Sequence, residues 1–251
     1  MSGMIQWPTA KYWTKAWNPY IGCKACSPAC VHCYANAWAA RFGIPFEPHP
    51  TMHGLRGVPT KGVVFCGNMT DAFGEWVRPD LREEALMTAL AHGGRGATYL
   101  WLTKRVLNMV ETVSNVGTMS GMRSGMEDNH FFGYTGENQE WFDKRQKESM
   151  GLPTWANLWY SLEPLLGPIY MGAALVRSSL KWVVVGAESG PNRRPCGLGW
   201  VASIVAQCQS AGVPVFVKQL CLPDGRFTNR IEEFPEHLRI RQVPWAKEGG
   251  K

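Results

Sequence analysis

The sequence predicts an α/β fold, a partial (β/α) TIM-like barrel of about six to seven parallel strands. The first observation is that apolar runs of about five residues alternate with helical patterns along the 251-residue chain, as expected of parallel strands with crossover helices. The second is that polar or charged residues follow one run after another. Because the carboxyl ends of barrel strands meet at one mouth, we expect these residues to converge there.

The expected strands are short and mostly apolar, which favours burial on both faces. They are 16–21, 62–67, 97–102, 130–134, 158–162, 181–185 and 213–217. Helices are expected at 35–42, 79–92, 139–147 and 200–211, where good helix formers or helical apolar spacing occur. The loose mixture of Ser, Gly, Met and Asn at 114–128 instead predicts a mobile loop.

Length and composition indicate an ordered protein, which we interpret as a single domain over 1–251. Residues 1–21 form an aromatic lead-in and residues 221–251 a C-terminal extension. No apolar run approaches the roughly 18 residues of a membrane helix, and the first residues lack the pattern of a secretory signal. Eight cysteines then indicate ligands and buried thiols rather than disulfides. We therefore expect a cytoplasmic protein without a membrane partner.

The charge balance suggests an anionic partner. The net charge is +6 and the chain has 12 tryptophans, a combination that suits phosphate contacts and base stacking on DNA, RNA or a nucleotide. A basic surface with tryptophans in the core explains the same composition equally well.

Four cysteines, Cys23, Cys26, Cys30 and Cys33, lie within a few residues of one another. Cysteine-rich turns bury little apolar surface, whereas thiolates are soft metal ligands. Two C-x-x-C pairs would suit structural zinc, but only three residues separate them, fewer than zinc ribbons usually have. The spacing C-x3-C-x2-C of Cys26, Cys30 and Cys33 is instead typical of radical S-adenosylmethionine enzymes, in which three thiolates hold a 4Fe–4S cluster.

The chain also resembles a family of phage and prophage proteins, the three-cysteine-motif family, which is similar to radical S-adenosylmethionine enzymes. The resemblance runs almost end to end, through Trp17-Asn-Pro, Gly22-Cys23, Ser27-Pro28, Cys30, Cys33-Tyr34-Ala35, Met69-Thr-Asp71, Leu102-Thr-Lys-Arg105, Glu137-Asn-Gln139, Ser161–Pro168, Gly186–Gly190, Arg194-Pro195, Gln207-Cys208 and Ala211–Gln219. It implies a partial barrel, a 4Fe–4S cluster and S-adenosylmethionine.

The resemblance places the cluster on Cys23, Cys30 and Cys33, so Cys26 is an addition in this chain. The spacing of the wider superfamily favours Cys26 as the alternative first ligand. The family has Gly-Gly-Glu where this chain has Gly186-Ala187-Glu188, a change that keeps the carboxylate.

The polar strand ends supply the other candidate residues. Those expected to hold the amino, carboxylate and ribose groups of the cofactor are Asn68, Thr70, Asp71, Glu137 and Asn138. Those expected to act on the substrate, as phosphate anchors or proton donors and acceptors, are Lys104, Glu163, Glu188 and Lys218. A structural alternative is that Glu163 and Glu188 pair with Lys104 or Lys218.

The expected activity is radical abstraction of hydrogen from a modified pyrimidine, in phage DNA or as a nucleotide, since family members occur near genes for DNA hypermodification. Such an enzyme would need a reductant of the flavodoxin or ferredoxin type. One alternative is a DNA photoproduct repair lyase with the same chemistry. Another is a non-catalytic nucleic-acid-binding protein with a structural zinc or cluster knuckle.

Overall fold

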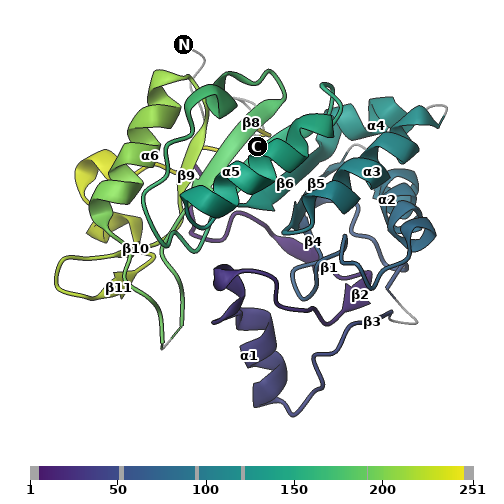
Figure 1. Ribbon diagram of the computed structural model, residues 1–251, viewed down its shortest axis with the longest axis horizontal. Helices are drawn as coiled ribbons and strands as arrows, with labels where there is room; N and C mark the ends of the chain where they lie inside the picture. The colour runs from purple at the N-terminus through teal and green to yellow at the C-terminus, as the bar shows by residue number, and fades with distance from the viewer. Residues whose placement is uncertain (1–5, 51–53, 94–95, 120–121, 191, 246–251) are drawn as a thin grey trace. The chain divides into compact units, whose positions relative to one another are not determined.

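The structure is a computed structural model that describes residues 6–50, 54–93, 96–119, 122–190 and 192–245 (Figure 1). It confirms the predicted fold class, because seven strands form one sheet in the order β1-β4-β5-β6-β7-β8-β9 and the pairings given are all parallel. The strands are β1 (Lys15–Trp17), β4 (Gly62–Cys66), β5 (Ala97–Thr103), β6 (His130–Thr135), β7 (Asn157–Leu162), β8 (Leu180–Val185) and β9 (Val215–Val217).

The chain divides into two compact units. The first, which we call the cysteine unit, contains residues 13–134 and 145–157. The second, the C-terminal unit, contains residues 1–12, 135–144 and 158–251. Each unit has its own buried apolar core.

In the cysteine unit, the parallel strands β4, β5 and β6 carry continuous apolar runs because both faces are covered. Val64, Leu100, Trp101 and Phe132 are almost completely buried in them. Three helices, α2 (Pro79–Gly93), α3 (Val106–Thr118) and α4 (Met122–Asn129), pack on one another. The helix α1 (Tyr34–Arg41) lies apart from this group (Figure 1).

The expected first strand at 16–21 was too long. Only β1 joins the main sheet, where Trp17 pairs with Cys66 of β4. Tyr20 and Ile21 form a separate strand, β2 (Tyr20–Ile21), which pairs antiparallel with β3 (His49–Pro50). Pro19 lies between the two strands, and proline has no amide hydrogen to continue a ladder.

The prediction of a loop at 114–128 was wrong for 114–118 and 122–128, and residues 120–121 of that range lie outside the described residues. Helix α3 extends to Thr118, and α4 covers Met122–Asn129. Val106, Met109, Val113 and Val116 lie on one face of α3 at helical spacing and are fully buried. Packing of this apolar face stabilises a helix in a stretch whose local composition favours a loop.

In the C-terminal unit, β7, β8 and β9 continue in parallel, and Trp159 and Trp182 are completely buried. Tyr12 packs edge-on against both indole rings. Trp101, Trp159 and Trp182 are therefore core residues. Their burial agrees with the second explanation of the composition, in which tryptophans lie in the core. The expected C-terminal helix is α6 (Leu198–Ser210).

The remaining elements are short, except for one helix whose residues are divided between the two units. They are α5 (Gln139–Glu148), the hairpin of β10 (Leu220–Cys221) and β11 (Phe227–Thr228), and the 3-10 turns η1 (Pro28–Cys30), η3 (Ser149–Gly151), η4 (Gly172–Val176), η5 (Ile231–Glu233) and η6 (Glu236–Leu238). Across the described part of the chain, helices are too short or too polar to span a membrane.

Acid should destabilise the protein through His130. This imidazole is buried, accepts a hydrogen bond on Nδ1 from Trp101 Nε1 at 3.1 Å, and stacks on Tyr99. Burial lowers the pKa of His130 to about 3. Below its ordinary pKa the unfolded chain takes up a proton that the folded chain excludes, so stability present above pH 6.5 is lost as the pH falls. We expect His130 to lower the free energy of unfolding by about 2 kcal/mol between pH 6.5 and pH 5.

Urea denaturation at the two pH values measures this loss, and His130→Gln is the control. The variant should lose the histidine contribution to the pH dependence while keeping that of the carboxylates. An unchanged pH dependence in His130→Gln would contradict the prediction.

Candidate functional site

The cysteine loop, residues 22–34, lies in the cysteine unit. Its four thiols are free and partly exposed. Pro28–Cys30 form the turn η1, and Cys33 is the N-cap residue of α1. The backbone of the loop entrance is held on both sides, because Thr70 Oγ1 donates to Gly22 O at 2.7 Å and the Cys23 amide donates to Phe46 O at 3.3 Å.

The other cysteines are also free thiols, as the composition predicts. Cys66, Cys196 and Cys208 are buried, and Cys221 is partly exposed. Burial raises the pKa of the Cys196 thiol to about 12 and has the same effect on Cys208. These protonated thiols act as small apolar side chains.

Within the cysteine loop, the protonation of Cys26 and Cys30 is linked. A hydrogen bond from the Cys26 thiol lowers the pKa of Cys30, and Lys104 lowers it further. The same hydrogen bond raises the pKa of Cys26. Burial raises the pKa of Cys23 to about 11, against the opposing charge of Arg105. Among the residues that the structure describes, no three Cys, His, Asp or Glu side chains converge as metal ligands would.

Asp71 connects the strand ends of the cysteine unit. Its Oδ1 accepts hydrogen bonds from Thr103 Oγ1 at 2.7 Å and from the Phe73 amide at 3.1 Å. Its Oδ2 accepts from the Lys104 amide at 3.0 Å and from Arg105 Nη1 at 3.3 Å. The carboxylate is nearly buried, and these four donors compensate for its loss of water. Asp71 thus organises the end of β4 against the end of β5.

Arg105 connects Asp71 to the cysteine loop. Its Nη2 donates to Lys24 O at 2.6 Å, and its Nη1 lies 3.9 Å from Cys23 Sγ. Its guanidinium also stacks on Trp76 with 4.7 Å to the ring centroid. Sequence reasoning assigned no role to Arg105, although it belongs to the quoted stretch Leu102-Thr-Lys-Arg105. A planar, permanently charged group with five donors suits this bridging position.

Asn68 and Thr70 also contact the cysteine loop and its approach. Asn18 Nδ2 donates to Asn68 Oδ1 at 2.7 Å, and the Tyr34 hydroxyl donates to Asn68 O. Thr70 binds Gly22 O, as described above. The segment after β4 therefore supports the loop, and Asn18 is a second residue that sequence reasoning missed.

In the C-terminal unit, Lys218 pairs with Glu163, as the structural alternative expected of the contact itself; the role of the pair stays a prediction. Lys218 Nζ lies 3.3 Å from Glu163 Oε1 and 3.4 Å from Oε2. Burial raises the pKa of Glu163, although Lys218 opposes the shift. The site also requires glycine at position 186, since a Cβ there would lie 2.7 Å from Glu163 Oε1. Glu163 and Lys218 form a partly buried acid–base pair, with side chains 10% and 22% exposed.

Glu188 pairs with Arg194, a partner that sequence reasoning did not name. The Arg194 amide and Nε each donate to Glu188 Oε2 at 2.9 Å, and Nη2 donates to Oε1. This paired carboxylate raises the pKa of Arg194, and Glu137 adds to the effect through its charge. Glu137 is completely buried.

Asn138 caps a helix. Its Oδ1 accepts a hydrogen bond from the Trp141 amide at 3.0 Å, and its main-chain oxygen accepts one from the Phe142 amide. This is the arrangement of an N-cap residue.

The predicted site residues therefore form two groups. Asn68, Thr70, Asp71 and Lys104 lie with the cysteine loop in one unit. Glu137, Asn138, Glu163, Glu188 and Lys218 lie in the other. The convergence of both groups on one mouth stays a prediction.

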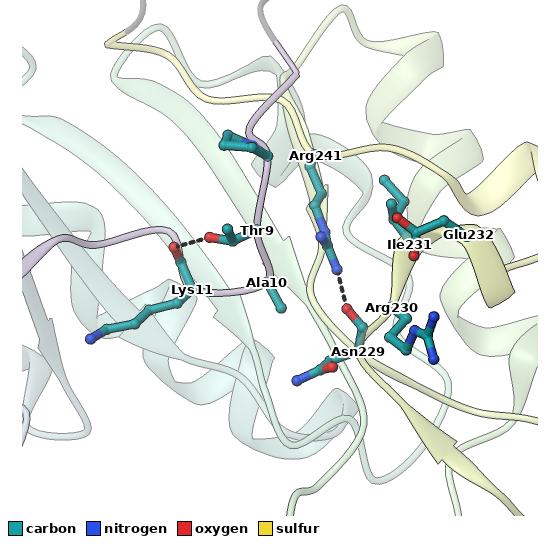
Figure 2. Close-up of a pocket in the computed structure, with 9 residues that line it drawn as sticks. Thr9, Ala10, Lys11, Asn229, Arg230, Ile231, Glu232 and Arg241 are labelled. Carbon is teal, nitrogen blue, oxygen red and sulfur yellow. Dashed lines mark hydrogen bonds between the residues drawn. The ribbon is translucent and has the colours of Figure 1, made fainter.

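A cavity of about 360 Å³ lies elsewhere in the C-terminal unit (Figure 2). The segment Pro8–Lys11 lines one side, and Asn229–Glu232 and Arg241 line the other. Two of the lining residues are hydrogen-bonded to each other, since Arg241 Nη2 donates to Asn229 O at 2.6 Å (Figure 2). None of the predicted site residues lines it.

Comparison with known proteins finds one family. The model described as "Protein of unknown function (DUF5131)" matches residues 8–232, which is most of the chain. No curated protein and no solved structure matches.

Proposed function

We propose that this chain, which belongs to the DUF5131 family of proteins of unknown function, is a radical S-adenosylmethionine enzyme whose cysteine loop holds a 4Fe–4S cluster. The observation that carries the proposal is the loop itself. It presents four partly exposed free thiols at the strand ends of a parallel α/β fold. The resemblance to the phage three-cysteine-motif family supports the same activity.

The donor set fits such a cluster in its chemistry. Iron–sulfur clusters are held by thiolates, and two cations adjoin these thiols. Lys104 lowers the pKa of Cys30, and Arg105 lies against Cys23. Since the described thiols do not converge on one point, binding has to bring them together. Their partial exposure leaves them room to rotate.

The bound cluster and S-adenosylmethionine together would supply hydrogen abstraction from an unreactive carbon of the substrate. The chain's own residues position and protect that chemistry. Asp71 and Arg105 anchor the cysteine loop, Asn68 and Thr70 support its approach, and Glu137 and Asn138 remain proposed contacts of the cofactor.

In the C-terminal unit, Glu163 is suited to proton transfer. Burial raises its pKa, so this carboxyl group holds a proton at a higher pH than an exposed glutamate, and Lys218 Nζ lies within 3.4 Å. We propose that the pair serves the substrate, a modified pyrimidine in DNA or a nucleotide, and that Glu188 and Arg194 support the same site. The electrons would come from a flavodoxin- or ferredoxin-type reductant.

Anaerobic reconstitution with iron and sulfide tests the proposal. We expect about four irons and four sulfides per chain, with an absorption spectrum that changes when S-adenosylmethionine is added. Cys30→Ala and Cys33→Ala should each abolish iron uptake, because each removes one of three anchors. Cys208→Ala, which removes a buried thiol far from the loop in sequence, is the matched control and should retain full iron.

The same assay identifies the first ligand. Cys23→Ala should lose the cluster and Cys26→Ala should retain it. The reverse result would move the site to the shorter spacing, and full iron in Cys30→Ala would refute the cluster assignment.

A second candidate is a nucleic-acid-binding protein with a structural zinc. The observation that favours it is that Asp71 and Glu188 already have internal hydrogen-bond partners, an arrangement that requires no substrate. Stoichiometric zinc without iron uptake would select this candidate.

A further inference from the structure

Helix α1, which begins directly after Cys33, has an inverted pattern of burial. A surface helix normally turns its large apolar residues toward the core. In α1 the buried residues are the small Ala35 and Ala39, whereas Tyr34 and Trp38 are 55% and 48% exposed. The Tyr34 hydroxyl donates to Asn68 O within the unit, but the burial of α1 on its own unit does not explain why the Trp38 ring is half exposed.

The exposed aromatic residues form one stripe, which continues to the residue after the helix. Tyr34, Trp38 and Phe42 follow one another at intervals of four residues, so they share a face. Phe42 is 58% exposed. The rings of Trp38 and Phe42 lie 4.9 Å apart, centroid to centroid, with their planes tilted by 50°. We call Tyr34, Trp38 and Phe42 the aromatic stripe.

The segment that carries the aromatic stripe has charges of one sign. The segment 22–44 contains Lys24 and Arg41 and no aspartate or glutamate. Arg41 lies next to the stripe, with its guanidinium carbon 5.8 Å from the centroid of the Phe42 ring. A set of exposed flat rings with a cation beside it complements a polyanion that carries flat groups.

We propose that the aromatic stripe is a stacking platform for the bases of single-stranded nucleic acid. In this proposal the rings stack on bases, and Arg41 and Lys24 contact phosphates. A strand bound on α1 would lie next to the cysteine loop, because Cys33 is the N-cap residue of this helix. Sequence-tolerant binding of single strands uses this combination of aromatic faces and cations. The inference rests on the proposed function only for what happens to the strand; the binding itself requires no cluster.

Fluorescence anisotropy with a labelled oligothymidylate strand tests the platform on the full chain. Trp38→Ala and Phe42→Ala should each weaken binding by about 5- to 150-fold, the range for loss of one stacked base. Trp38→Phe should keep most of the affinity, whereas Trp38→Leu, which is apolar without a ring, should lose it. Tyr170→Ala is the matched control, since Tyr170 is 74% exposed and lies in the C-terminal unit, and it should bind normally.

An abasic strand of the same length separates base stacking from phosphate contacts. Wild type should bind it more weakly than oligothymidylate, and Trp38→Ala should show a smaller difference in affinity between the two strands than wild type does. The proposal would be overturned if Trp38→Ala lost the same affinity for both strands, or if the wild type bound neither strand. It would also be overturned if the stripe acted only in self-association or in protein capture. Iron uptake, measured in parallel, reports on the proposed function independently, so the failure of one does not imply that of the other.

Discussion

Replacement of Asp71 by alanine is expected to lower the free energy of unfolding by about 3–5 kcal/mol, the usual cost of removing one partner from a buried ion pair. The Asp71 and Arg105 side chains are only 7% and 6% exposed. The variant leaves three donors and a buried guanidinium without their acceptor, and Glu75, which is mostly exposed, compensates only part of that charge. Urea denaturation followed by circular dichroism measures the loss.

Asp80→Ala is the matched control. Asp80 also pairs with an arginine, Arg78 at 2.6 Å, but both side chains are mostly exposed, and exposed pairs contribute little to stability. The double variant Asp71→Ala/Arg105→Met should lose less free energy of unfolding than the two single variants lose in sum. It removes the arginine charge that Asp71→Ala alone would leave without a partner. Equal effects of Asp71→Ala and Asp80→Ala would contradict the role assigned to Asp71.

Gly22→Ala is expected to be the most disruptive single-methyl change in the cysteine loop, at about 2–5 kcal/mol. Gly22 has φ +83°, and a Cβ there would lie 2.2 Å from the Glu47 carbonyl oxygen. The left-handed backbone costs an alanine roughly 1–2 kcal/mol, and forcing a methyl group into a packed site adds about 1–3 kcal/mol. The obstacle is backbone, which cannot rotate away.

Gly43→Ala separates the two contributions. Gly43 has φ +64°, but nothing lies within 4 Å of an added Cβ. Its variant should therefore lose only the conformational part, about 1–2 kcal/mol, in the same urea titration. If both variants lose the same free energy, the close approach of Gly22 to residue 47 is not present in solution.

The α/β class was predictable because it depends on local patterns that repeat. The runs at 62–67, 97–102 and 181–185 are mostly apolar, and such strands form β4, β5 and β8 in a parallel sheet. The errors occurred where composition and packing disagree. The stretch 114–128 has a loop-like composition, yet helix formation there depends on burying Val113 and Val116.

The candidate site shows the same division. The sequence by itself determined the fold class and the concentration of four thiols in one loop, because chain order specifies strand periodicity and cysteine spacing. Only the tertiary structure decided the partners: Arg105 with Asp71 and Lys24, Lys218 with Glu163, and Arg194 with Glu188. These pairs depend on which strand ends become neighbours and on how deeply each side chain is buried. Neither property can be predicted from residue type or local spacing.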